Sequence, residues 1–138
     1  MKKKQIAFTI NTLEQAENII LETKIYNIIP ILHFKNYILR GFGSEFIRTF
    51  KNMLIAKFGK SSFKLYVDCA FDNSLIINMA KEKIDYIKFR GNIIILKKIK
   101  NIANKNNVLL NPSFNIVDCR NRKNINLKIK KIYAREIK

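Results

Sequence analysis

The chain has 138 residues and a mass of 16.2 kDa, the size of one domain. Cys69 and Cys119 lack the paired spacing of a disulfide or zinc framework, and no apolar run approaches the roughly 18 residues of a membrane span. The apolar run Ile6–Ile10 after the lysine-rich start is too short for the core of a signal peptide. We therefore predict a single cytoplasmic domain over residues 1–138 with reduced thiols.

The formal net charge is +17, from 27 lysine and arginine residues against 10 aspartate and glutamate residues. Such an excess is typical of proteins that attract the phosphates of nucleic acid. Genomic base bias is the alternative, because residues with A/T-rich codons are abundant while glycine, proline and tryptophan number 4, 2 and 0. The basic residues are spread over several predicted helices, which favours base bias.

Five short apolar runs indicate repeated βα units, because four of them are followed by stretches of helical period. The runs are Ile6–Ile10, Ile28–Leu32, Phe63–Val67, Tyr86–Phe89 and Val108–Leu110. Strands that are apolar on both sides, with helices between them, form a parallel sheet. The predicted fold is α/β with four to five parallel βα units, either a partial (β/α) barrel or an open doubly wound sheet.

In the first half of the chain, a strand over Gln5–Ile10 should lead to a helix over Thr12–Ile25. Thr12 followed by Gln15 is the pattern of a capping box. Pro30 favours an edge position for the second strand, Ile28–Leu32. A long loop over residues 33–43 is then expected before a helix over 44–58, and long loops in compact βα domains often carry function.

In the second half, the expected strands are Phe63–Cys69, Tyr86–Arg90 and Val108–Leu110, with helices over 72–83 and 93–106. Asn115–Cys119 is compatible with a strand or a loop. Residues 124–138 fit a strand or a helix equally well, so we describe residues 112–138 as an irregular basic extension.

The best candidate for an anion site is the run Arg40-Gly41-Phe42-Gly43-Ser44 before the predicted helix. Glycines allow close approach of the backbone, and the helix start together with Arg40 favours a phosphate or carboxylate. The alternative is a glycine turn with Ser44 as helix cap. Arg90 and Gly91 before the next helix start repeat the pattern, so an anionic small molecule is the leading ligand class.

Two residues are candidates for catalysis at the carboxyl edge of the sheet. His33, the single histidine, is suited to acid–base chemistry, although a histidine beside an aromatic residue is more often a packing residue. Asp68 ends the third strand and could act as an acid or base, or bind a divalent cation with Asp72. The alternatives are a helix cap for Asp72 and a hydrogen bond to backbone or Arg90 for Asp68. These residues predict no defined metal site and identify no cofactor.

The run Leu65–Cys69, a helix and then Ile87–Gly91 resembles small bacterial proteins of unassigned activity that are built as part of a (β/α) barrel. The resemblance covers roughly residues 5–111, with Lys, Asn and Ile where those proteins carry Ala, Gly and Arg. It implies a fold and no reaction.

These patterns leave three hypotheses of function. The first is binding of, or an enzymatic reaction on, a small phosphorylated or carboxylated metabolite. The second is noncatalytic binding of nucleic acid, and the third is a degenerate barrel fragment that acts in protein association. A half-barrel would leave the inner face of its sheet open, so we expect either a homodimer or a cover made from residues 112–138.

Overall fold

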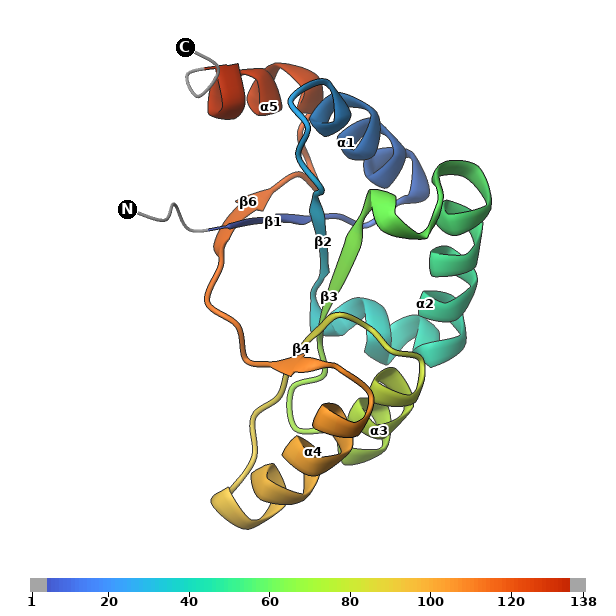
Figure 1. Cartoon of the computed structure of the whole chain (residues 1–138), viewed down its shortest axis with the longest axis vertical. Coiled ribbons are helices and arrows are strands. Elements are labelled where there is room, and N and C mark those ends of the chain that lie inside the picture. Colours follow the sequence, from blue (N-terminus) through green and yellow to red (C-terminus); the bar gives the residue numbers. More distant parts are fainter. Residues whose placement is uncertain (1–4, 135–138) are drawn as a thin grey trace.

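A computed structural model describes residues 5–134, in which strands and helices alternate along the chain (Figure 1). The strands are β1 (Ile6–Thr9), β2 (Ile31–Phe34), β3 (Lys64–Asp68), β4 (Tyr86–Lys88), β5 (Leu109–Leu110) and β6 (Asn115–Asp118). The helices are α1 (Leu13–Ile25), α2 (Asn36–Phe58), α3 (Asn73–Lys81), α4 (Ile93–Lys105) and α5 (Ile125–Tyr133), with a 3-10 turn over Lys60–Ser62. The α/β fold with parallel βα units is confirmed.

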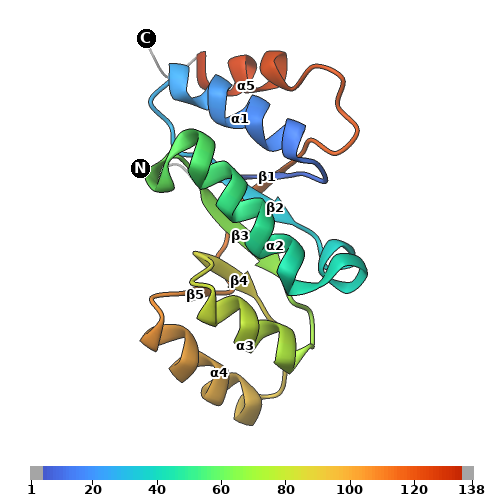
Figure 2. The same ribbon diagram turned by 90° about the vertical axis from the view of Figure 1, so that its right-hand side faces the viewer.

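The sheet shows a partial barrel rather than a doubly wound arrangement. Its six strands follow the order β5-β4-β3-β2-β1-β6, and every pair is parallel. Right-handed crossovers between sequential neighbours place all helices on one face. Figure 2 shows these helices side by side over the outside of the sheet, and Figure 1 shows no helix of the described residues on the inner face.

Side-chain caps define where the helices begin. Thr12 and Gln15 form the predicted capping box at the start of α1. Asp72 accepts the backbone N–H of Leu75 at the start of α3, and Asn92 caps α4 in the same way. Asp72 is therefore a helix cap, which was the alternative to a metal ligand.

The expected loop over residues 33–43 is wrong. His33 lies inside β2, and α2 begins at Asn36, because Ile38 and Leu39 are buried against the sheet. The helix breaks at Gly43, where φ is +79°, a value that favours glycine. Pro30 precedes β2 and does not force it to an edge, since β2 lies between β1 and β3.

Residues 112–134 contain a strand and a helix, where the sequence analysis left the secondary structure undecided. The segment Asn115–Asp118 is a strand, one of the two alternatives for this segment, and it pairs with β1 as the sixth strand of the sheet in the described residues. α5 packs beside α1, with Ile125, Ile129 and Tyr133 buried. The prediction of an irregular extension is wrong for residues 112–134, because pairing with β1 and packing against α1 order this segment and neither contact is visible in the local sequence. Residues 135–138 lie outside the described part.

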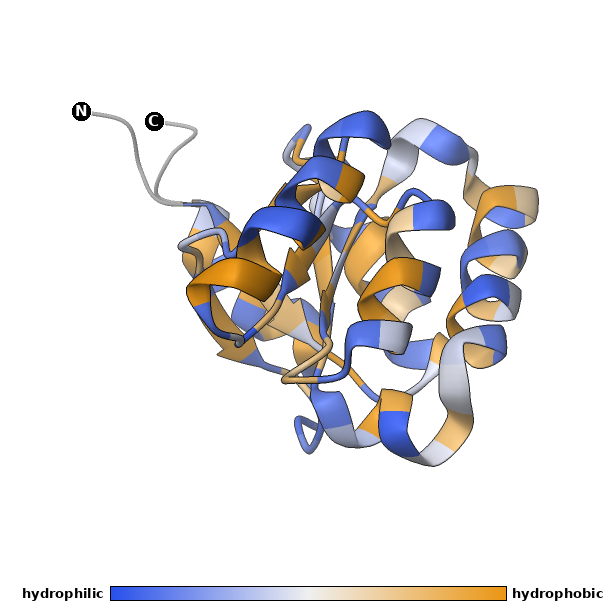
Figure 3. Cartoon of the chain, turned by 90° about the horizontal axis from the view of Figure 1, so that it is seen from below, coloured by the Kyte–Doolittle hydropathy of each residue, from blue (hydrophilic) through white to orange (hydrophobic). Residues whose placement is uncertain are grey.

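The main core lies between the sheet and its helices, which turn hydrophobic residues inward and hydrophilic residues outward (Figure 3). Fully buried strand residues include Phe8, Leu32, Phe34, Val67 and Ile87. Burial of such side chains contributes roughly 1.5–3 kcal/mol each. This layer holds the strands in place, so their carboxyl ends form one edge.

A second, smaller core covers the inner face of the sheet. Ala7, Ile31, Tyr66 and Tyr86 are buried there, and Phe114 packs against them. The Phe114 ring lies edge-on to Tyr86 at 4.8 Å and to Tyr66 at 5.5 Å between centroids. Residues 111–114, which we call the strap, join β5 to β6 and bring Phe114 to this position (Figure 1).

We predict that Phe114→Ala lowers the unfolding free energy by about 2 kcal/mol in urea denaturation. The value lies below the roughly 3–5 kcal/mol of a fully buried phenylalanine, because Phe114 is half-buried. Phe71→Ala is the matched control, since Phe71 is 69% exposed; its effect should stay within about 0.5 kcal/mol. Equal losses in both variants would show that the strap does not hold the inner face.

Candidate functional site

A pocket of about 970 Å³ lies at the carboxyl edge of the sheet, between the ends of β2, β3 and β4 and the strap. Its lining comprises His33, Lys35, Asn36, Tyr37, Arg40, Tyr66, Asp68, Lys88, Phe89, Arg90, Asn111, Pro112, Ser113, Phe114 and Ile116. The carboxyl ends of parallel strands are where ligands bind in barrels and open α/β sheets. The pocket therefore lies at the edge of the sheet where the sequence predicts a candidate site.

The pocket is strongly cationic. Four basic residues, Lys35, Arg40, Lys88 and Arg90, line it with a single carboxylate, Asp68. None of these four basic side chains forms an ion pair or hydrogen bond with a residue in the described range 5–134. Unpaired cations gathered around one cavity favour an anion, since each can donate hydrogen bonds to its oxygens.

Asp68 stands among these cations and is held by the backbone. Its carboxylate accepts the N–H of Ala70 at 2.9 Å, and Asn36 donates to its carbonyl oxygen at 2.9 Å. In the sheet it is the register partner of Lys88. The predicted hydrogen bond to backbone is present, and the carboxylate still lines the pocket, where it can accept a proton or a hydroxyl hydrogen bond.

His33 is buried at the floor of the pocket, with 7% of its surface exposed. Nδ1 lies 2.8 Å from the hydroxyl of Thr9, and the ring lies 4.7 Å from that of Tyr66 between centroids. Burial lowers the pKa of His33 to about 4; Asp68 opposes this shift, while Lys35, Lys88 and Arg120 add to it. His33 is therefore neutral at pH 7, and a weak base.

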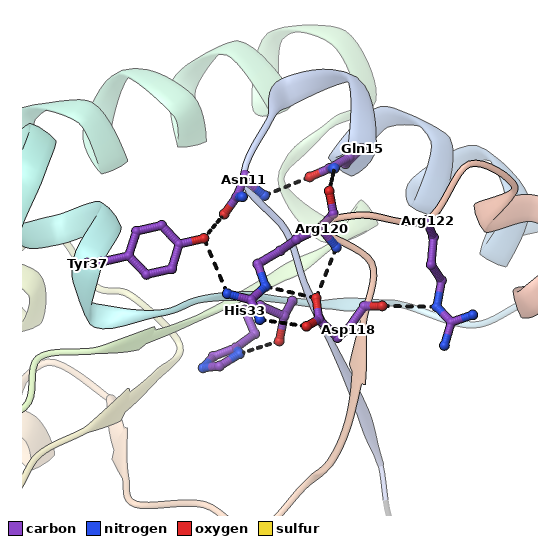
Figure 4. A network of polar contacts seen from close by, with 8 residues as sticks. Asn11, Gln15, His33, Tyr37, Asp118, Arg120 and Arg122 are labelled. Atoms are coloured by element: carbon purple, nitrogen blue, oxygen red, sulfur yellow. Dashed lines mark hydrogen bonds and ion pairs between the residues drawn. The ribbon is translucent and has the colours of Figure 1, made fainter.

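A polar network joins the carboxyl ends of β1 and β6 to α2 beside the pocket (Figure 4). Arg120 donates to both carboxylate oxygens of Asp118, at 2.9 and 2.6 Å, which lowers the pKa of Asp118. Tyr37 donates to the side chain of Asn11 and accepts from Arg120. Gln15 donates to the carbonyl of Arg120 at 2.8 Å, so β6 is joined to α1 and α2.

The structure brings together only part of the predicted anion site. Arg40 and Arg90 line the pocket with the candidate catalytic residues His33 and Asp68. The remaining predicted residues, Gly41, Gly43, Ser44 and Gly91, do not line it. Gly41 is helical and Gly43 lies at the helix break, because α2 starts before them. Gly91 has a packing role: an added Cβ would lie 2.7 Å from the Phe89 ring.

Lys35, Lys88, Tyr66 and the strap were missed by the sequence analysis. Their signal is alternation with period two: Tyr66 and Asp68 point inward, while Leu65 and Val67 belong to the outer core. The sequence analysis interpreted the strands as apolar on both sides, and it therefore did not predict polar side chains on the inner face of the sheet. No local sequence pattern predicts the strap, because it is needed only where the sheet does not close and its inner face requires a cover.

Both cysteines are free and buried. Burial raises the pKa of Cys69 above its usual range and that of Cys119 to about 11. Thiols of this kind are inert at neutral pH. Within the described range, no three or more His, Cys, Asp or Glu side chains gather as a metal site, and no helix there is long and apolar enough to cross a membrane.

Comparison with known proteins shows the fold alone. No protein-family model and no curated protein matches the chain. Among solved structures, a provisionally assigned fructose-1,6-biphosphate aldolase from Coccidioides immitis is similar, with a TM-score of 0.60 and 16% identity. The match covers 78% of this chain and 44% of the aldolase, so the chain spans less than half of that protein. The resemblance to barrel-like proteins is confirmed at the level of fold.

We predict that protonation of His33 destabilises the protein between pH 6.5 and pH 4. The unfolded chain binds this proton first, because its histidine pKa is near 6.5 while the folded value is about 4. The unfolding free energy should therefore fall by about 3 kcal/mol from pH 7 to pH 4. Urea denaturation across this range should show a slope that His33→Gln lacks, and equal slopes in both proteins would contradict the assignment.

Proposed function

We propose that this chain binds a small phosphorylated or carboxylated metabolite in the pocket at the carboxyl edge of its partial barrel. Lys35, Arg40, Lys88 and Arg90 contact the anionic group. Asp68 accepts a hydrogen bond from a hydroxyl of the same molecule and is the candidate for proton transfer if the molecule reacts. The observation that carries the proposal is the set of four basic side chains in one pocket without a partner in residues 5–134.

Electrostatic repulsion between the four basic side chains supports a bound anion as the reason for their arrangement. Four like charges around one carboxylate repel one another, and the fold tolerates this only at a cost in stability. A bound phosphate or carboxylate removes that repulsion. The provisional assignment of the Coccidioides immitis protein names a phosphorylated sugar, which agrees with this ligand class without identifying the ligand.

Phosphate should stabilise the protein in proportion to its occupancy of this pocket. We expect inorganic phosphate to raise the melting temperature above that in chloride of equal ionic strength, because a ligand of the folded state shifts the equilibrium by mass action. Arg90→Ala and Lys88→Ala should each reduce the shift by at least half. Differential scanning fluorimetry measures all three proteins.

Lys60→Ala is the control, since it removes the same charge from an exposed position before β3, at the opposite end of the strands. It should respond to phosphate as the parent does. A phosphate effect that Lys60→Ala reduces as much as Lys88→Ala would indicate general screening of the +17 charge. Absence of any phosphate effect would contradict the proposed function.

Nucleic-acid binding is the second candidate, and one surface favours it. Residues 122–131 contain Arg122 and four lysines but no acidic residue. Arg122, Lys123, Lys128 and Lys131 line a shallow hollow of about 400 Å³ beside α5. A basic surface of this kind suits a phosphate backbone, which it recognises without reading sequence.

Binding through this surface should weaken steeply with salt, because each neutralised phosphate releases counterions. Titration of a labelled single strand and a duplex by fluorescence anisotropy, from about 50 to 200 mM salt, measures the slope. Lys128→Ala combined with Lys131→Ala should make the slope shallower by about two phosphates, while Lys88→Ala should not change it. No binding at the lowest salt would exclude this candidate.

A further inference from the structure

The protonation state of His33 follows from the hydroxyl beside it. Thr9 is completely buried, and its hydroxyl forms one hydrogen bond with the described residues, to Nδ1 of His33 at 2.8 Å. If Nδ1 carried the hydrogen, the Thr9 O–H would have no acceptor. An unsatisfied buried donor costs about 1–3 kcal/mol. The Thr9 O–H therefore donates to Nδ1, and the neutral ring carries its hydrogen on Nε2.

The Nε2–H group opens into the pocket. Among the described side chains, no enclosed nitrogen or oxygen lacks a hydrogen-bond partner. Nε2 forms no hydrogen bond within residues 5–134, so it is not enclosed, and His33 lines the pocket. Figure 4 shows the ring with one nitrogen toward its β1 neighbour and the other directed away. The same reasoning applies to the hydroxyl of Tyr66, which lines the pocket without a described partner.

His33 and Tyr66 form a pair of neutral donors at the pocket floor. They are register partners on β2 and β3, with ring centroids 4.7 Å apart. Burial raises the pKa of Tyr66, so its hydroxyl keeps its hydrogen. Neutral imidazole can polarise a carbonyl oxygen by donating from its N–H group.

We propose that His33, held by Thr9 in the Nε2–H form, and the hydroxyl of Tyr66 donate hydrogen bonds to a carbonyl or ionised oxygen of the molecule in this pocket. The ligand half of this statement rests on the proposed function, whereas the protonation form of His33 does not. His33 then binds and orients the ligand instead of abstracting a proton, and Thr9 is a positioning residue.

The groups around His33 agree with a neutral ring. Lys35 lies just after β2 at the start of α2, Lys88 lies on β4 and Arg120 just after β6, and all three oppose a positive charge on His33. Asp68 from β3 is the one group that favours the imidazolium. Burial and the three cations outweigh it.

Nitrogen-15 NMR of histidine-labelled protein tests the protonation form directly, because His33 is the single histidine and its two ring nitrogens are assigned without ambiguity. At pH 7 we expect a protonated Nε2 and an unprotonated Nδ1. Thr9→Val should give a mixture of both neutral forms, and Thr9→Ser should restore the parent spectrum. A protonated Nδ1 in the parent, or no change in Thr9→Val, would overturn the inference.

Addition of inorganic phosphate or acetate tests the ligand half. Either anion should shift the Nε2 signal more than that of Nδ1. In isothermal titration, His33→Leu should bind phosphate about tenfold more weakly, the loss of one hydrogen bond to a charged group, while His33→Gln retains a donor and loses less. Phosphate that raises the melting temperature without moving Nε2 would overturn the role of His33 alone; phosphate without either effect would overturn the proposed function too.

Discussion

Incomplete closure of the barrel is the constraint on which the rest of this structure depends. Eight strands close a (β/α) barrel and fill its interior with side chains, whereas this sheet has six strands and an open inner face. Apolar residues on that face must still be removed from water. The strap meets this need by carrying Phe114 onto Tyr66 and Tyr86. The sheet is thus covered by helices outside and, inside, by the two ring contacts of Phe114.

The same constraint produces the pocket. The strap passes across the inner face and supplies Asn111, Pro112, Ser113 and Phe114 to the pocket wall. Asn111 anchors it, because its side chain accepts the backbone N–H of Phe89 at 2.8 Å. Below the strap the inner row is aromatic, and beyond it, toward the carboxyl edge, the row becomes charged with Asp68 and Lys88. The aromatic cover and the charged pocket therefore lie at successive levels of one face.

The fold could be predicted from sequence because its signals are local. Alternating apolar runs and the Thr12 and Asp72 caps indicate βα units without knowledge of any distant contact. Four of the candidate site residues, Arg40, Arg90, His33 and Asp68, line one pocket, and the glycine loop expected around Arg40 is part of a helix instead. Lys88 reaches the pocket through the register of β4 with β3, and Lys35 through the start of α2 directly after β2. The strap depends on the number of strands. None of these features is set by neighbouring residues alone.

A bound anion is compatible with a neutral His33, although an anion raises the pKa of His33 and burial lowers it. A phosphate bound among Lys35, Arg40, Lys88 and Arg90 offsets the cations that help lower the pKa of His33, so the pKa must rise on binding. A pKa of about 4 before binding lies well below 7, so a wide margin is available for this rise. Burial against Thr9 and Tyr66 supplies this margin, because desolvation persists when the charges are compensated. Because His33 lies deep in the pocket, its N–H donor stays in place when an anion compensates the surrounding charges.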